Sequence, residues 1–359
     1  MGTNENARKR ALYTGQAHQH ALASLRRDQR KGCGPIPVAT TAQAALEALI
    51  LERIGEWNPV FWSPFIPAYG TAWVDPSPED LTIGIPVQYL PDLIRELIPT
   101  LRPKEASASD DVEIQGIPGL RFFFENGHVV LYRPGEPALV RIPMKNESLW
   151  HKAIKIAIDD FGSDLTFPWD SHPNAWHPVE LDFINAFWPG RYAIGGEHYQ
   201  ASRLASDLLR RLPGLCDPFL AHDMWFNFHG AHDSEYHIQF EWQNSRPPNA
   251  VLDLILDQTF GLDVQIDLVH DQHSLADAYA DHCTRVRLLS RDGSGSRIDL
   301  RYLRFKGDLA EDVPPLFEGM RSRRRELEHL YDYPPSPPAP TAPRRVDESI
   351  NMDGGYYGT

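Results

Sequence analysis

The chain has 359 residues, of which 42% are hydrophobic and 23% are charged, and its formal net charge at pH 7 is −14. This composition is typical of a globular protein with room for two domains. The sequence has no apolar run of the roughly 18 residues that a membrane span needs, and no apolar signal segment near the N-terminus, so we expect no membrane partner. Three scattered cysteines without a CxxC pair predict neither a disulfide framework nor a structural zinc site, which favours a cytoplasmic protein.

Residues 1–56 are predicted to form a helical N-terminal arm. Residues 1–31 carry seven lysines and arginines against two acidic residues, a net charge of +5, which leaves −19 on the remainder. Good helix formers and an apolar stripe at Leu12, Leu22 and Leu25 favour a solvated helix. Because the acidic body repels nucleic acid, this basic arm is the one place where a nucleic-acid partner could bind, and we keep that as an alternative.

Residues 57–165 are predicted to form a first module of helices and antiparallel strands. Its aromatic beginning contains prolines that forbid a continuous helix, so we expect a loop wrapped on the domain. Asn126 and Gly127 are typical of a type I′ turn, which places Glu125 opposite His128 in a hairpin. The expected elements are a strand at 81–90, a helix at 91–101, the hairpin at 120–133, a strand at 138–143 and a helix at 148–162.

Residues 166–332 are predicted to form a second module whose first elements follow the order β-α-β-β-α-β. This order is typical of a ferredoxin-like sandwich with the sheet order 4-1-3-2. A further hairpin follows, and its outward face holds Arg285, Arg287, Asp299 and Arg301. The expected elements are a strand at 191–195, a helix at 198–212, a hairpin at 224–242, a helix at 249–260, a strand at 263–269, a hairpin at 285–305, a helix within 311–331 and a Pro-rich disordered tail at 333–359.

The hairpin at 224–242 is the most informative segment. Apolar and polar residues alternate on both of its strands. The alternation predicts that Phe226 lies opposite Ile238 on a buried face. It also predicts that Asn227 lies opposite His237 on a polar face, which is where chemistry could take place.

Four residues around this hairpin form the candidate metal site: His229, His232, His237 and Glu235. Imidazole nitrogen and carboxylate oxygen are donors that zinc accepts, and three ligands leave a position open for water. A divalent metal such as zinc would make the protein a metal-dependent hydrolase or nuclease. In the ferredoxin-like order, the two histidines that follow the strand at 263–269 share this end of the sheet. However, the sequence has no HExxH motif, and a solvated sheet face explains the same histidines.

The segment at 169–188 contains His172 and His177, which are residues of the type that general acid–base catalysis uses. A structural interpretation explains the segment better. Pro178 suits the first turn of a helix, and Glu180 lies near the positive end of that helix.

No complete catalytic motif is present in the sequence: the GxSxG, P-loop and dinucleotide-binding fingerprints are all absent. We therefore predict an α+β protein with two antiparallel sheet-plus-helix modules, the second of them ferredoxin-like. Its predicted function is non-catalytic binding or assembly, with a protein partner docking on the termini. A metal-dependent hydrolase or nuclease is the alternative. The predicted units are the arm at 1–56, modules at 57–165 and 166–332, and a tail at 333–359.

Overall fold

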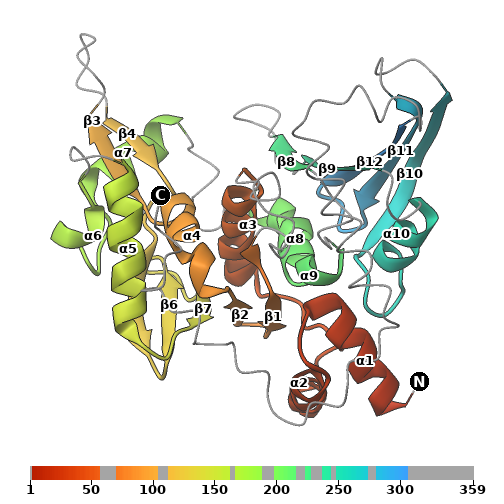
Figure 1. The fold of residues 1–359 in the computed structure, drawn as a ribbon, viewed down its shortest axis with the longest axis horizontal. Coiled ribbons are helices and arrows are strands. Elements are labelled where there is room, and N and C mark those ends of the chain that lie inside the picture. The colour runs from red at the N-terminus through yellow and green to blue at the C-terminus, as the bar shows by residue number, and fades with distance from the viewer. Residues whose placement is uncertain are drawn as a thin grey trace.

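The computed structural model confirms an α+β protein. The residues that it describes are 2–56, 70–103, 112–161, 166–187, 198–215, 223–227, 237–243, 248–273 and 280–305. Their strands form two five-stranded sheets and one two-stranded sheet, with helices packed between and around them (Figure 1). The predicted strand at 191–195, the helix within 311–331 and the tail at 333–359 lie outside the described residues.

The two large sheets come from different halves of the chain. Sheet 1 has the order β1-β2-β7-β6-β5, formed by β1 (Trp73–Pro76), β2 (Asp80–Gly84), β5 (Arg121–Glu125), β6 (His128–Tyr132) and β7 (Leu139–Pro143). Sheet 2 has the order β8-β9-β12-β11-β10, formed by β8 (Asp223–Asn227), β9 (His237–Gln243), β10 (Val264–His273), β11 (Ala280–Ser290) and β12 (Arg297–Phe305). The small sheet pairs β3 (Thr100–Pro103) with β4 (Val112–Gln115).

Sheet 1 and sheet 2 have the same topology. Each begins with an antiparallel pair, β1–β2 or β8–β9, continues through a helix, α4 (Leu90–Leu97) or α10 (Pro248–Ile255), and ends with an antiparallel meander. The last strand of each meander returns to the centre, where β7 lies parallel to β2 and β12 lies parallel to β9. The predicted ferredoxin-like order is therefore not the observed one, because β12 takes the place beside β9 that the prediction assigns to residues 191–195.

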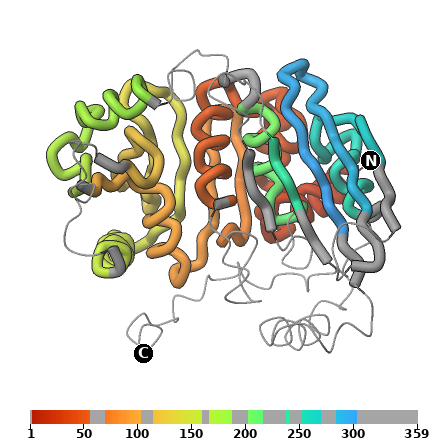
Figure 2. The backbone as a smooth tube through the Cα atoms, turned by 90° about the horizontal axis from the view of Figure 1, so that it is seen from above, coloured from red at the N-terminus to blue at the C-terminus, as the bar shows by residue number. Residues whose placement is uncertain are grey.

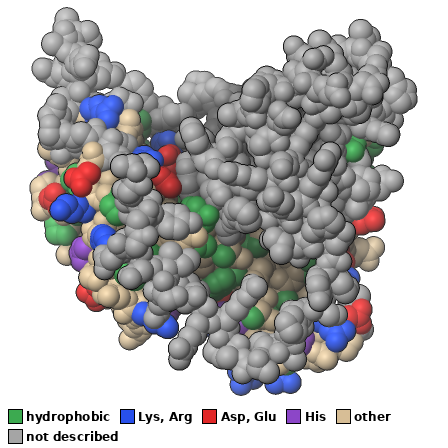
Figure 3. Space-filling view, in the orientation of Figure 1, with side chains coloured by type: hydrophobic (Ala, Val, Ile, Leu, Met, Phe, Trp, Pro, Cys, Tyr) green, Lys and Arg blue, Asp and Glu red, His purple; other side chains and the backbone are tan. Residues whose placement is uncertain are grey.

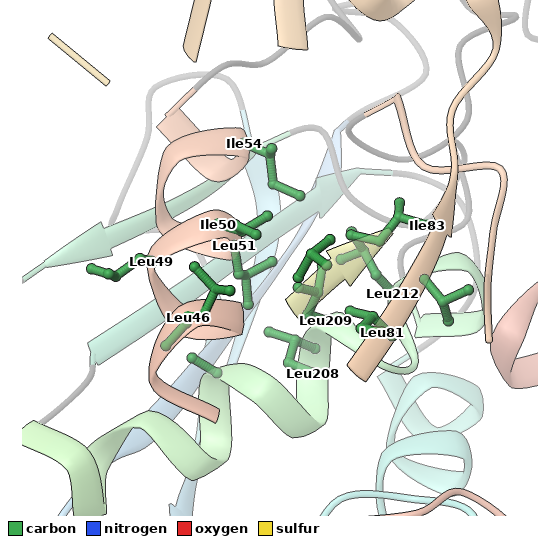
Figure 4. Close-up of a cluster of buried hydrophobic side chains, with 14 of the residues drawn as sticks. Leu46, Leu49, Ile50, Leu51, Ile54, Leu81, Ile83, Leu208, Leu209 and Leu212 are labelled. Carbon is green, nitrogen blue, oxygen red and sulfur yellow. The ribbon is translucent and has the colours of Figure 1, made fainter. Parts of the chain in front are cut away.

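Two helices from different halves pack against each other between the sheets. They are α3 (Thr41–Glu56) and α8 (His198–Leu209), and both views place α3 in the middle of the molecule (Figures 1 and 2). Figure 4 shows Leu46 of α3, Leu208 of α8 and Leu81 of β2 in one buried cluster. Because α3 is buried on nearly all sides, it is the centre of the core rather than a surface helix.

A buried ion pair joins these two helices. Arg210, just after α8, donates from Nη2 and Nε to the two carboxylate oxygens of Glu47 on α3, at 2.6 and 2.7 Å. Ser206 and Gln43 donate to the same carboxylate at 2.6 and 2.8 Å, and Arg210 Nη1 donates to the carbonyl of Pro37 at 2.6 Å. Both charged groups are fully buried. Removing charges from water is costly, and this pair is tolerated because each of these polar atoms has a partner.

The N-terminal arm is a pair of helices that packs against both halves, and the prediction of one solvated helix is wrong. α1 (Thr3–Thr14) and α2 (His18–Arg30) turn at Gly15, where φ is 68° and an added Cβ would lie 2.4 Å from a backbone oxygen. Tyr13 donates to the carbonyl of Leu254 at 2.7 Å and stacks on Phe260, both in the second half. Accordingly, the N-terminus lies beside the second half in both views (Figures 1 and 2).

Several predicted elements are confirmed, and others differ at their ends. The hairpin of β5 and β6 has Glu125 opposite His128, and Asn126 and Gly127 have positive φ as a type I′ turn requires. The predicted helix at 249–260 ends earlier, at Ile255 of α10, and shortly afterwards the Asp257 carboxylate accepts the backbone N–H groups of residues 259 and 260. The remaining helices are η3 (Val87–Tyr89), α5 (Glu147–Phe161), α6 (Pro168–Ser171), α7 (Pro178–Phe187) and α9 (Leu212–Leu215).

We expect Arg210→Met to lower the free energy of unfolding by about 3–5 kcal/mol, because it leaves the Glu47 carboxylate buried without its counter-charge. Urea unfolding followed by circular dichroism measures this loss. Arg141→Met is the control, since Arg141 pairs with Asp80 and Glu125 at the surface, where ion pairs contribute about 0–1 kcal/mol. Equal losses in the two variants would contradict the role assigned to the buried pair.

Candidate functional site

The candidate metal site lies only partly within the described residues. Strands β8 and β9 have the predicted register, with Phe226 opposite Ile238 and Asn227 opposite His237. His237 is the first residue of β9. The other three candidate ligands, His229, His232 and Glu235, lie outside the described residues.

His237 is held by charged residues of the neighbouring strand. Its Nε2 forms a hydrogen bond with the carboxylate of Asp299 on β12, and its Nδ1 lies 3.4 Å from Nη2 of Arg297. Both ring nitrogens therefore have protein partners. Within the part of the chain that the structure describes, no group of three or more histidine, cysteine, aspartate or glutamate side chains is placed to hold a metal ion.

The observed topology separates the histidines that the ferredoxin-like order would bring together. β10 runs antiparallel to β11, β11 antiparallel to β12, and β12 parallel to β9, so β10 and β9 run in the same direction. His270 and His273 lie near the C-terminal end of β10, whereas His237 is the first residue of β9. They therefore lie at opposite ends of sheet 2. The predicted convergence is wrong because it assumed that β10 runs the same way as β8.

Asp299 is the centre of a polar network on the outward side of sheet 2. Arg287 on β11 donates from Nε to Asp299 Oδ1 at 2.9 Å, and Nε of Arg297 lies 3.7 Å from Oδ2. One carboxylate thus faces two guanidinium groups and the imidazole of His237. The sequence predicts that Arg287 and Asp299 face outward. It does not predict that they lie close to His237, because the contact between β9 and β12 joins residues 62 positions apart.

We call the outward side of these strands the arginine face, and its residues are His237, Arg285, Arg287, Arg297, Asp299 and Arg301. The ladder of β11 and β12 places Arg285 opposite Arg301. Arg285 is exposed to solvent. On the next strand, β10, Leu268 lies opposite Arg287 and is 47% exposed. By position in the ladder, Glu241 of β9 lies opposite Arg301, and Asp223 of β8 lies opposite Glu241. The positive charge of this side is therefore most concentrated on β11, at Arg285 and Arg287.

The matching side of sheet 1 is covered at the β5 end by the segment around α7. Glu180 of α7 accepts the backbone N–H of His177 at 2.9 Å, which is the geometry of a capping box. The same carboxylate accepts from the fully buried Arg121 of β5 at 2.6 and 3.1 Å. His177 Nδ1 in turn accepts the backbone N–H of Val179 at 3.2 Å. These contacts agree with the structural interpretation of this segment over a catalytic one.

The basic arm covers the other end of that side. Arg10, which is fully buried, donates to Asp28 at 2.7 Å and to Asp75 of β1 at 3.1 Å, and Arg27 donates to Asp75 at 3.0 Å. Burial raises the pKa of Asp75, but hydrogen bonds from His20 and Arg27 and the charges of Arg27 and Arg10 outweigh it, so the pKa is held well below its ordinary value. Part of the arm's positive charge is therefore neutralised within the fold.

Other basic side chains remain at the surface of the arm. Arg8 and Arg26 are exposed, and Figure 3 shows basic side chains along the lower edge of the molecule, where Figure 1 places α2. Acidic and basic side chains alternate over much of the remaining coloured surface in this view (Figure 3). The arm therefore offers a smaller basic surface than its sequence suggests.

Comparison with known proteins adds no further information about the site. No protein-family model, no curated protein and no solved structure matches this chain. None of the described helices is both long and apolar enough to cross a membrane.

We expect Asp75→Asn to destabilise the protein at pH 6 by on the order of 3 kcal/mol, since it removes a buried partner of two arginines. A carboxyl whose pKa is depressed on folding contributes stability above its unfolded pKa, about 3.9, and this contribution is lost as the pH falls below that value. The difference between the wild type and Asp75→Asn should therefore shrink between pH 4 and pH 2. Thermal unfolding at several pH values measures it, with the more exposed Asp80→Asn as the control; a difference that stays constant would be evidence against the depressed pKa.

Proposed function

We propose that the protein is a non-catalytic binding protein and that its arginine face binds an acidic surface of a protein partner. The observation that carries this proposal is the difference in charge between two sheets of the same topology. On sheet 1, the central Arg141 is bound by two carboxylates, those of Asp80 and Glu125, at 3.3 and 2.8 Å. On sheet 2, the equivalent central residue is Asp299, and it is surrounded by cations.

The arginine face has the properties of a protein-binding surface. Arginine is enriched in protein interfaces because its planar guanidinium group binds carboxylates with two hydrogen bonds and also packs on apolar groups. Asp299 holds Arg287 and Arg297 in place before a partner arrives, which reduces the conformational entropy lost on binding. Leu268 supplies apolar contact area beside Arg287. These features favour a partner that places carboxylates opposite Arg285 and Arg287.

Two other observations argue against nucleic-acid binding by the arm and against docking through the N-terminus. Asp28 and Asp75 neutralise part of the arm's positive charge within the fold, which leaves fewer cations for phosphate contacts. The first helices are packed into the fold through Arg10 and Tyr13, so the N-terminus is not a free docking arm. Docking through the tail at 333–359 remains a prediction, because that tail lies outside the described residues.

Affinity capture from a cell extract tests the proposal with two charge-reversed variants of equal net charge. Arg285→Glu with Arg287→Glu changes the arginine face, and Arg8→Glu with Arg26→Glu changes the exposed side of the arm. We expect the first variant to lose a protein that the wild type and the second variant both retain. With the isolated partner, the loss of affinity should be at least tenfold, or about 1.4 kcal/mol.

The same experiment also contains the outcomes that would reject the proposal. If the arginine-face variant retains every protein that the wild type captures, this surface is not the binding site. If only the arm variant loses its bound material, and that material is nucleic acid, the arm alternative is correct. Adding salt should then weaken the binding strongly, because phosphate contacts release counterions.

The alternative function, a metal-dependent hydrolase or nuclease, uses His229, His232, Glu235 and His237 as ligands of a divalent metal such as zinc. For a binding protein we expect far less than one equivalent of zinc, manganese or iron by elemental mass spectrometry of protein purified without a His-tag or chelator. Near-stoichiometric metal that is lost in His229→Ala, but kept in the control His270→Ala at the other end of sheet 2, would favour the enzyme instead.

A further inference from the structure

In the first half of the chain, the helix that follows the last strand of the meander covers the edge of the sheet. This helix is α5, which begins at Glu147, shortly after β7 ends at Pro143, and it packs beside α4. Its Trp150 is buried and contacts the ring of Phe122 on the edge strand β5, with 5.5 Å between ring centroids. His151 contacts Phe124 at 5.4 Å. The inner side of β5 is thus partly buried under α5.

The equivalent positions of the second half are exposed. We take Ile266 of β10 as the counterpart of Phe122 of β5, because each lies opposite a buried leucine of the neighbouring strand. These leucines are Leu131 in sheet 1 and Leu288 in sheet 2. The next inner position of β10 is Val269. Ile266 is 47% and Val269 57% exposed, although Leu288 beside them is fully buried. The inner side of β10 therefore carries an apolar surface over which no helix lies among the residues that the structure describes, in contrast to β5 under α5.

A helix fits this surface better than an added strand. The ladder of β10 is interrupted by an irregularity between Ile266 and Leu268, at the position of the charged Asp267. Bulges and charges on an edge strand are features that oppose pairing with another strand. A helix lying on one side of the sheet needs no free backbone groups, so the irregularity does not prevent it from packing there.

The chain itself supplies a segment of suitable sequence and position. β12 is equivalent to β7, and it ends at Phe305, at the same end of sheet 2 as His273 of β10. If the chain after Phe305 runs back along β10, it reaches Val269 first and Ile266 second. The residues that follow include 311–331, where the sequence predicts a helix that can begin at Pro314 and Pro315 and has apolar positions at Leu316, Phe317, Met320, Leu327 and Leu330.

We propose that residues 311–331, which lie outside the described residues, bind to the inner side of β10 over Ile266 and Val269, as α5 binds to β5. The meander of the second half would then also be followed by a helix over its edge strand, as in the first half. This inference does not depend on the proposed function, because the arginine face is on the opposite side of sheet 2. It assigns the apolar surface of β10 to the chain's own C-terminal segment rather than to a foreign partner.

Limited trypsin digestion of the full chain, followed by mass spectrometry, tests this binding. The segment contains the cleavage sites Arg321 and Arg323 to Arg325, and the tail contains Arg344 and Arg345, which serve as an internal reference. In the wild type we expect cleavage at 321–325 to be at least tenfold slower than at 344–345. Ile266→Asp with Val269→Asp should remove most of this protection.

Two controls separate binding from general destabilisation. Phe123→Asp, at a position 40% exposed on sheet 1, should leave the cleavage rates unchanged. Leu327→Asp alters the segment and not the sheet, and it should accelerate cleavage at 321–325 as the β10 variant does. Equal rates at the two sites in the wild type would overturn the proposal. Protection that persists in the β10 variant would overturn it as well, because the segment would then be bound elsewhere.

Discussion

The arrangement of the two halves depends on the buried pair between Glu47 and Arg210. Water solvates isolated charges far better than a protein core does. Each of these two groups is therefore stable in the core only when the other lies within hydrogen-bond distance of it. Two fixed hydrogen bonds between the same two groups leave α3 and α8 little freedom to slide or rotate against each other. Apolar packing between α3 and α8, whose Leu46 and Leu208 belong to one buried cluster, supplies most of the driving force but tolerates small shifts. The ion pair therefore determines the geometry, and the apolar residues provide the stability.

The same backbone topology supports two different surfaces. In sheet 1 the outward side is covered at its two ends, since Arg121 is buried by the segment around α7 and Asp75 is bound by the arm, while its centre around Phe123 and Arg141 stays accessible. In sheet 2 the corresponding strands carry the arginine face. The difference arises from single residues at equivalent positions, above all Arg141 and Asp299, and from the presence of the arm over one sheet. A fold of this kind can thus keep its core while the outward residues of the strands change their partners.

Local features of the fold can be predicted from the sequence, and long-range ones cannot. The Asn126–Gly127 turn and the alternation along β8 and β9 fix the register of their hairpins, because the paired strands are close in sequence. The parallel contact of β9 with β12 leaves no local signal, so the sequence predicts Asn227 opposite His237 but does not connect Asp299 with it. The sequence does not predict the burial of Arg10 for the same reason, since its partner Asp75 is 65 positions away. A basic helix also has the same sequence pattern whether it faces solvent or packs against the rest of the protein.

The contact between Tyr13 and Leu254 has a consequence for synthesis of the chain. The two residues are 241 positions apart, so the arm cannot reach its final place until Leu254 has left the ribosome. At translation rates of about 5–20 residues per second, the arm waits roughly 12–50 seconds for its partner. During that time Tyr13 and the apolar residues near it have no permanent cover. The nascent chain therefore exposes an apolar surface of α1 that the folded protein covers.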